Sequence, residues 1–141
     1  MCLTRNLVWM VLWATLSAWT PLAAADWSEL AKDEDIVYYF DKDSVMPVHV
    51  SRYAWTMVDF SKGDKTSSGD AYKSVMTRWR LYCKTDMVVR LSVSFFEKSM
   101  GKGREVAAED APELRMREVP IRPNTYLATL KKEVCSGKPA T

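Results

Sequence analysis

The feature that most constrains the fold is a pair of alternating segments, residues 72–83 and 87–96, separated by only three polar residues. Alternation with a period of two is typical of a strand with one buried face, and so short a connection joins antiparallel neighbours. If residues 84–86 form the loop, one face of the first segment opposes only apolar residues of the second. The facing pairs are Val75–Phe95, Thr77–Val93, Trp79–Leu91, Leu81–Val89 and Cys83–Met87. A shift by one residue would place Arg90 against Leu81 and bury polar groups. The segments therefore predict a hairpin with this face in the core.

The opposite face of the hairpin carries a small basic cluster, which is a candidate surface for binding a partner. Its members are Arg78, Arg80, Tyr82 and Arg90. In the register above, Arg80 stands opposite Arg90, and like charges that oppose each other directly destabilise a sheet. Arginine beside tyrosine is frequent where proteins bind one another. The alternative is a solvated outer face whose charges are neutralised by Asp or Glu on neighbouring strands, and the sequence leaves both open.

Further strands are predicted along the rest of the chain. Strand patterns occupy residues 36–40, 48–60, 104–108 and 114–119, and a polar loop with two glycines occupies residues 61–70. His49, the single histidine, then lies in a strand and has no sequence partner that marks it as a base or a ligand. Consecutive strands with tight connections favour an antiparallel meander over a parallel sheet.

The chain ends in a predicted helix over residues 125–135, with Asn124 as its N-cap. Leu127, Leu130 and Val134 fall on one helical face. A helix this short is marginal alone and must pack against another element. The fold class that follows is α+β, mostly β, with one sheet and a C-terminal helix.

The first 25 residues have the layout of a secretory signal peptide. Arg5 precedes an apolar run from Leu7 to Ala18, and Pro21 and three alanines lead to Asp26. The run is shorter than the roughly 20 residues needed to span a bilayer, which favours cleavage over a retained anchor. We expect an exported domain of residues 26–141, with no transmembrane segment once the signal is removed. No cysteine lies near the cleavage point, so we expect no lipid anchor.

Two cysteines, Cys83 and Cys135, remain after the signal and its Cys2 are removed. An exported chain with two cysteines allows one intramolecular pairing, and an oxidising compartment favours it. The alternatives are a reactive thiol and a zinc site, which needs about four ligands where the chain offers two distant cysteines and His49. A Cys83–Cys135 disulfide would tether the helix to the core face of the hairpin.

Charge and motifs exclude several classes of function. The chain has 20 basic and 18 acidic residues, and removal of Arg5 leaves 19 against 18, whereas a generic nucleic-acid binder carries a large basic excess. Asp41-x-Asp43 lacks the glycine and the distal glutamate of a calcium loop. Gly101-x-Gly103 lacks the third glycine of a dinucleotide-binding loop. We therefore expect no cofactor and no enzyme, although a catalytic site assembled only by the fold stays open.

The order of residues in the mature chain resembles the bacterial surface-adhesin protein E family, which occurs in exported proteins of Gram-negative bacteria. The matching positions are Trp27, Tyr38 to Asp41, Ser44, Val50, Trp55, Asp59, Tyr72-x-Ser74, Cys83, Arg90, Gly101-Lys102-Gly103, Pro123, Leu130 and Cys135. The resemblance covers nearly all of residues 26–141. It implies a curved antiparallel sheet with a C-terminal helix tethered to its concave side, and attachment to host extracellular-matrix proteins.

The expected function is that of an exported, non-catalytic, adhesin-like domain that binds another protein, in the periplasm or on the outer surface of a Gram-negative bacterium. A second hypothesis is an accessory protein or inhibitor that acts on an envelope enzyme through the loop Ser61 to Asp70. A third is a small ligand held between helix and sheet, which predicts an unfilled pocket near Trp79 and Leu91. Pairing of exposed sheet edges into a homodimer also stays open.

Overall fold

The computed structural model describes residues 25–110 and 117–136, so the expected signal peptide lies outside the described residues except for Ala25. The strands are β1 (Trp27–Lys32), β2 (Ile36–Asp41), β3 (Met46–Val48), β4 (Ser51–Lys65), β5 (Ala71–Tyr82), β6 (Met87–Phe96), β7 (Glu105–Asp110) and β8 (Glu118–Pro120). The helices are two short 3-10 turns, η1 (Lys42–Ser44) and η2 (Ser99–Gly101), and the α-helix α1 (Tyr126–Cys135).

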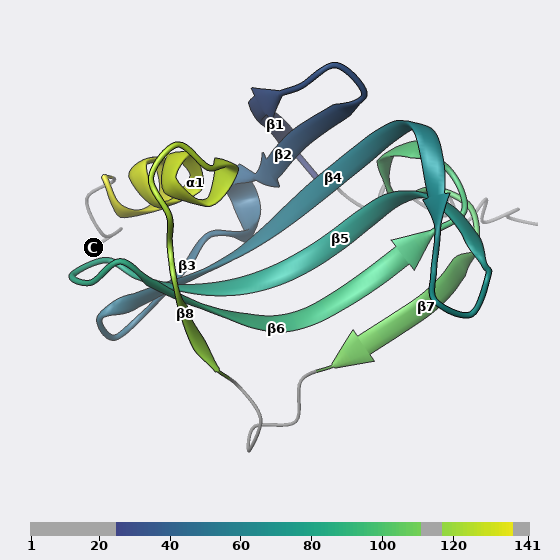
Figure 1. Cartoon of the computed structure of the whole chain (residues 1–141). Helices are drawn as coiled ribbons and strands as arrows, with labels where there is room; N and C mark the ends of the chain where they lie inside the picture. Colours follow the sequence, from purple (N-terminus) through teal and green to yellow (C-terminus); the bar gives the residue numbers. More distant parts are fainter. Residues whose placement is uncertain (1–24, 111–116, 137–141) are drawn as a thin grey trace, which may run out of the picture.

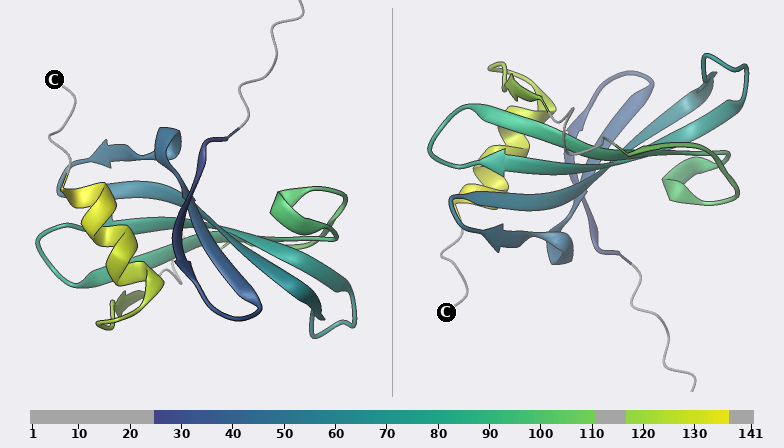
Figure 2. Two further views of the ribbon diagram at one scale, coloured as in Figure 1. Left: turned by 90° about the horizontal axis from the view of Figure 1, so that it is seen from above. Right: turned by 90° about the horizontal axis from the view of Figure 1, so that it is seen from below.

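The strands form one antiparallel sheet in the order β1-β2-β4-β5-β6-β7, with β3 paired to β4 and β8 paired to β6. Each strand on the main path pairs with a neighbour that lies close in the sequence, which confirms the predicted meander. The sheet is open and curved, α1 lies on its concave side, and the β1–β2 end of the sheet curls over toward α1 (Figure 1). Seen from above, α1 runs across one end of the sheet (Figure 2).

The main hydrophobic core lies between α1 and the concave face. Leu130 and Val134 of α1 are buried against Trp79, Leu81 and Val88 of the central strands. This confirms the predicted apolar face of the helix. The helix begins one residue later than predicted, because its N-cap is Thr125 and not Asn124. The hydroxyl of Thr125 accepts the capping hydrogen bond from the Ala128 N–H at 3.3 Å.

The hairpin register follows the prediction from Ser74 to Arg78 and then departs from it. Beyond that point Trp79 opposes Arg90 and Leu81 opposes Val88, because a β-bulge inserts an extra residue of β6. Four residues, not three, then lie between β5 and β6. A four-residue loop is usually built on a type I turn, which accommodates a connection without glycine.

The expected pairing of Arg80 with Arg90 is therefore wrong. Arg80 opposes Val89, and Arg90 opposes Trp79 on the concave face. The bulge brings Val88, which has no exposed surface, into the core beside Leu81. Burial of the apolar Val88 side chain stabilises the bulged register, and the simple alternating pattern did not predict it.

Three other expectations differ from the structure. His49 has φ +52 and lies in the turn between β3 and β4, so the single strand expected over residues 48–60 is two strands. Half of the expected loop 61–70 belongs to β4. This strand extends to Lys65, which pairs with Ala71 of β5. The sequence patterns did not predict the strand β1. Residues 114–116 of the last expected strand lie outside the described residues, and β8 covers its remainder.

Candidate functional site

The convex face of the sheet, which α1 does not cover, carries a patch of arginine and tyrosine side chains at one end. Cross-strand pairing places Tyr53 of β4 opposite Arg80 of β5, and Trp55 of β4 opposite Arg78. Tyr82 follows on the same face of β5 because alternate residues of a strand share a face. We call Tyr53, Arg78, Arg80 and Tyr82 the arginine–tyrosine patch. All four side chains are half-buried, and the view from below in Figure 2 shows the sheet from this side.

Cation–π contacts hold the two guanidinium groups against the tyrosine rings. Cζ of Arg78 lies 5.1 Å from the centroid of the Tyr53 ring, and Cζ of Arg80 lies 6.0 Å from it. Cζ of Arg80 is also 5.2 Å from the centroid of the Tyr82 ring. Nε of Arg80 donates a hydrogen bond of 3.1 Å to the Ser51 hydroxyl, which in turn donates to the Val48 carbonyl. These internal contacts therefore hold both arginines in place.

The patch carries positive charge that no carboxylate contacts directly within the described residues. The ion pairs found there are Lys62–Asp35, Arg104–Glu97 and Lys131–Asp86. The acidic residues that continue the cross-strand rows of Arg80 and Arg78 are Glu118 on β8 and Asp110 on β7. Their backbones lie two strands away from β5, a separation of about 10 Å. No ion pair of the described residues therefore neutralises the two guanidinium groups of the patch.

Tyr82 shows that the neighbouring charges act on the patch. Burial raises the pKa of its phenol, and the positive charge of Arg80 opposes this effect. The Glu118 carboxylate, as an acceptor for the phenol proton and as a negative charge, raises the pKa of Tyr82 further. Glu118 therefore borders the patch on the β8 side and interacts with its tyrosine.

Arg90 does not join the other three residues of the predicted cluster. The bulge places it on the concave face, where its side chain is exposed near the start of α1. There Tyr126 stacks on Tyr38 with ring centroids 4.5 Å apart. Burial raises the pKa of Tyr126 to about 12, Tyr38 adds to the shift, and the charge of Arg90 opposes it. The structure brings Arg78, Arg80 and Tyr82 together and separates Arg90 from them.

A family model described as surface-adhesin protein E matches residues 27–136. The chain belongs to this family. A solved structure of Haemophilus influenzae protein E, crystal form II, is similar with a TM-score of 0.60 and 17% sequence identity, covering 78% of this chain and 87% of that one. The crystal structure of protein E from non-typeable Haemophilus influenzae has a TM-score of 0.58 and 16% identity, covering 83% and 80%. At this identity the likeness shows a shared fold. A search of curated proteins found no match.

Several residues behind the resemblance to the surface-adhesin protein E family have a structural role. The Ser74 hydroxyl donates to the Lys98 carbonyl at 2.6 Å and accepts from the Gly101 N–H at 2.9 Å. A carboxylate oxygen of Asp59 accepts from the Met100 N–H at 3.0 Å. These bonds hold η2 against β4 and β5. A Cβ on Gly101, whose φ is +69, would come within 2.8 Å of Met57.

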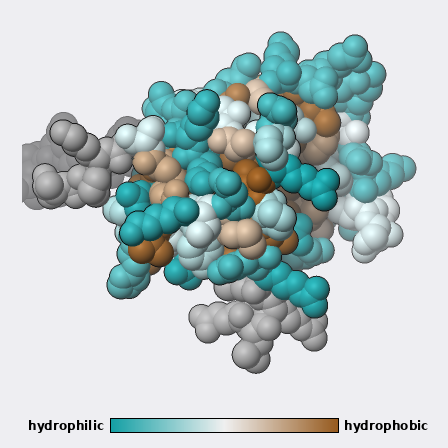
Figure 3. Space-filling model, turned by 60° about the vertical axis from the view of Figure 1, so that its left-hand side comes forward, coloured by the Kyte–Doolittle hydropathy of each residue, from teal (hydrophilic) through white to brown (hydrophobic). Residues whose placement is uncertain are grey.

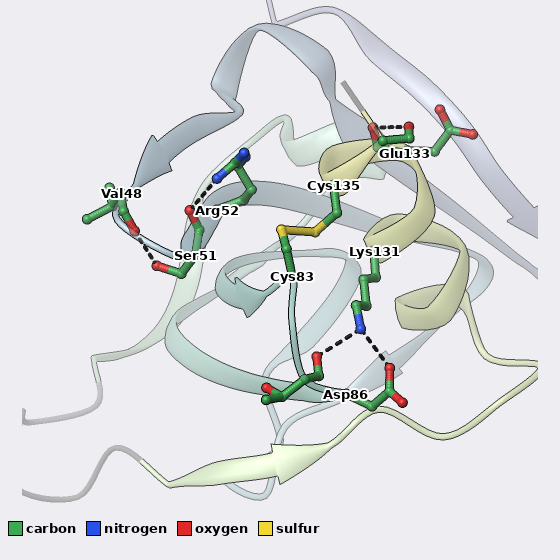
Figure 4. Close-up of a disulfide and its surroundings, with 10 residues drawn as sticks. Val48, Ser51, Arg52, Cys83, Asp86, Lys131, Glu133 and Cys135 are labelled. Carbon is green, nitrogen blue, oxygen red and sulfur yellow. Dashed lines mark hydrogen bonds and ion pairs between the residues drawn. A yellow bond between two sulfur atoms is a disulfide. The ribbon is translucent and has the colours of Figure 1, made fainter. Parts of the chain in front are cut away.

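The disulfide between Cys83 and Cys135 is formed, with the two Cα atoms 5.6 Å apart. It joins the end of α1 to the β5–β6 connection, as predicted, and Figure 4 shows Lys131 extending from the same helix toward Asp86. The ammonium group of Lys131 donates to the Asp86 carboxylate at 2.6 Å and to the Thr85 carbonyl at 2.8 Å. The disulfide and the Lys131–Asp86 ion pair therefore both join α1 to the β5–β6 connection.

An open groove of about 840 Å³ runs beside this end of α1, and Ile121, Pro123 and Ala128 supply part of its lining. Figure 3, turned toward this end, shows a mainly hydrophilic surface with small, separate apolar areas. Neither Trp79 nor Leu91 lines the groove, and the side chain of Trp79 is buried and donates a hydrogen bond to Thr56. The pocket expected near Trp79 for a small ligand is therefore not this groove.

The described part of the chain contains no group of three His, Cys, Asp or Glu side chains placed to hold a metal ion. Asp41 acts as the N-cap of η1, and its carboxylate accepts a hydrogen bond from the Asp43 N–H. Of the helices within residues 25–110 and 117–136, none is long and apolar enough to cross a membrane.

Proposed function

We propose that the chain is an exported, non-catalytic adhesin domain that binds a host extracellular-matrix protein through the arginine–tyrosine patch. Membership of the surface-adhesin protein E family supports a surface adhesin with a protein partner. The observation that carries the choice of face is the pair of half-buried arginines, each on a tyrosine ring, without a carboxylate contact in the described residues.

The physical case for this face is pre-organisation. Arginine and tyrosine are enriched among the residues that contribute most to the energy of protein interfaces. Binding is weakened when long side chains must first be ordered. Arg80 is already held by two aromatic rings and by Ser51, so a partner that contacts it avoids most of that cost.

The test is binding of residues 26–141 to a panel of immobilised extracellular-matrix proteins. The double variant Arg78→Gln/Arg80→Gln should lower the affinity for the bound matrix protein at least about tenfold, as expected for lost hydrogen bonds to charged groups. Arg90→Gln is the control for the opposite face, because it removes an arginine charge from the concave side and leaves the patch intact. Its affinity should stay within about twofold of the parent.

Thermal melting separates a contact role from a structural one. The double variant should stay folded and melt only a few degrees below the parent, because cation–π contacts at partly exposed sites contribute about 0.5–1 kcal/mol each. Equal losses of affinity in the double variant and in Arg90→Gln would contradict the choice of face. A large drop in the melting temperature of the double variant would show that the arginines stabilise the fold instead.

The β4–β5 hairpin favours a second candidate, an accessory or inhibitory protein of an envelope enzyme. The hairpin projects from the end of the sheet opposite α1 (Figure 1), and its strands stay paired up to Lys65 and Ala71. A protruding turn at residues 66–70 is suited to insertion into a partner. Replacing these residues with a two-residue turn should leave matrix binding unchanged if the patch is the contact face, and should abolish binding if the hairpin is.

A further inference from the structure

The arginine–tyrosine patch has hydrogen-bond donors left over after its internal contacts are made. Among the described residues, the Arg78 side chain donates no hydrogen bond, and the Arg80 side chain donates only through Nε to Ser51. Stacking on a ring occupies the face of a guanidinium and leaves its N–H groups free along the edge. Each arginine thus retains a pair of parallel N–H donors, the geometry that binds a carboxylate in bidentate fashion.

The spacing of the two arginines matches an extended peptide. Arg78 and Arg80 are two residues apart on β5, so their Cα atoms are about 7 Å apart along the strand. Alternate side chains of an extended peptide have the same separation and point to the same side. Two acidic residues with one residue between them would place one carboxylate at each guanidinium.

The surroundings of the patch determine where such a peptide lies. Glu118 and Asp110 border it on the β6 side and repel carboxylates there. On the β4 side lie the rings of Tyr53 and Trp55 and, beyond them on β3, the exposed side chain of Met46 opposite Tyr53. An acidic segment with flanking apolar residues is therefore favoured toward β4 and β3.

Building on the proposed binding role of this face, we propose that the partner presents an extended acidic peptide of the pattern Asp/Glu-x-Asp/Glu. Its two carboxylates form bidentate pairs with Arg78 and Arg80, and a flanking apolar residue packs on Tyr53 and Met46. The patch recognises carboxylates on a peptide and not a sulfated sugar, because the arginine spacing follows the repeat of an extended polypeptide.

The test uses residues 26–141 and fluorescence-labelled decapeptides that differ only in acidic pattern. The first has two glutamates separated by one residue, the second has them adjacent, and the third carries glutamines at the first peptide's acidic positions. We expect the alternating peptide to bind at least about fivefold more tightly than the adjacent one, and the glutamine peptide to show no binding. Raising the salt from 50 to 300 mM should weaken the binding.

Single variants locate the binding site. Arg78→Gln and Arg80→Gln should each weaken binding of the alternating peptide at least about fivefold, whereas Arg90→Gln should leave it unchanged. Cooperative melting transitions within a few degrees of the parent confirm that the variants are folded. Equal binding of the alternating peptide by Arg78→Gln and the parent would overturn the proposal, as would tight binding of a heparin oligosaccharide with no binding of any peptide.

Competition separates this proposal from the proposed function. If matrix binding depends on Arg78 and Arg80 but excess alternating peptide does not reduce it, the peptide pattern is wrong and the contact face stands. If matrix binding is indifferent to both arginines, the contact face itself is wrong. Displacement of the matrix protein by the alternating peptide, and not by the glutamine peptide, is the result we expect.

Discussion

At the scale of single residues, Ser74 and Asp59, two polar residues behind the resemblance to the family, have a structural role. Ser74 has no exposed surface, and its hydroxyl satisfies one backbone donor and one backbone acceptor of the β6–β7 connection. Asp59 satisfies the N–H of Met100, which has φ +58. A buried backbone group without a partner is costly, so these residues preserve a strained connection.

Ser74→Ala should therefore destabilise the domain. It leaves the Gly101 N–H and the Lys98 carbonyl without their partner, and we expect a loss of about 1 to 3 kcal/mol in the free energy of unfolding. Thermal melting should show a decrease of roughly 4 °C per kcal/mol for a domain of this size. Ser67→Ala, in the exposed β4–β5 turn, is the control and should change stability by less than about 0.5 kcal/mol. Identical melting of the two variants would refute the role of Ser74.

The raised pKa of Tyr126 predicts that the stability of the domain falls at alkaline pH. Its folded-state pKa is about 12, above the ordinary value of 10.0, so the folded state favours the protonated phenol. The resulting stability is fully present below pH 10 and is lost as the pH rises from 10 toward 12, up to about 2 to 3 kcal/mol. Tyr126→Phe should lose less stability between pH 9 and pH 11.5 than the parent in urea unfolding. Parallel curves for the two proteins would show that Tyr126 does not contribute this dependence.

At the scale of elements, α1 depends on the sheet for its position. A ten-residue helix is unstable alone, and three features of this helix dock it: the buried Leu130 and Val134, the ion pair of Lys131 with Asp86, and the disulfide. The ion pair is largely exposed on the Asp86 side and contributes little. Apolar burial and the covalent link therefore account for most of the docking energy.

Removal of the disulfide by Cys83→Ser/Cys135→Ser should lower the free energy of unfolding by about 2 to 5 kcal/mol. Hydrogen exchange should show loss of protection in α1 before loss in β5, because only the helix loses its tether. The parent protein under reducing conditions should melt like the variant, and reductant should not affect the variant. A parent that melts at the same temperature whether oxidised or reduced would contradict this account.

At the scale of the whole molecule, the convex face and the sheet edges are two of the exposed surfaces that the fold offers. The β7 edge carries Glu105, Glu109 and Asp110. Charges of one sign at an edge oppose pairing with a second copy. This favours a partner on the convex face over a homodimer joined through β7.

Export through the predicted signal peptide is an expectation at the scale of the whole molecule. In its native host, the full chain should yield a mature protein that begins at Asp26, detected by mass spectrometry. Protease added to intact cells should degrade the domain if it is displayed on the outer surface, as the adhesin proposal requires. Protection until the outer membrane is opened would place the domain in the periplasm and favour the envelope-enzyme alternative. A membrane-bound precursor that retains residues 1–25 would contradict signal cleavage.

The sequence by itself determined the antiparallel meander, the apolar face of the helix and the Cys83–Cys135 pairing, because period-two and helical patterns and a single cysteine pairing are local or countable properties. Only the tertiary structure decided which arginines lie together. One bulge residue in β6 moves Arg90 to the concave face, and long-range pairing with β4 brings Tyr53 to Arg78 and Arg80. A bulge forms where it improves the packing of the core, here around Val88 and α1. Because this packing energy depends on residues distant in the sequence, the alternating pattern of one strand does not predict the bulge.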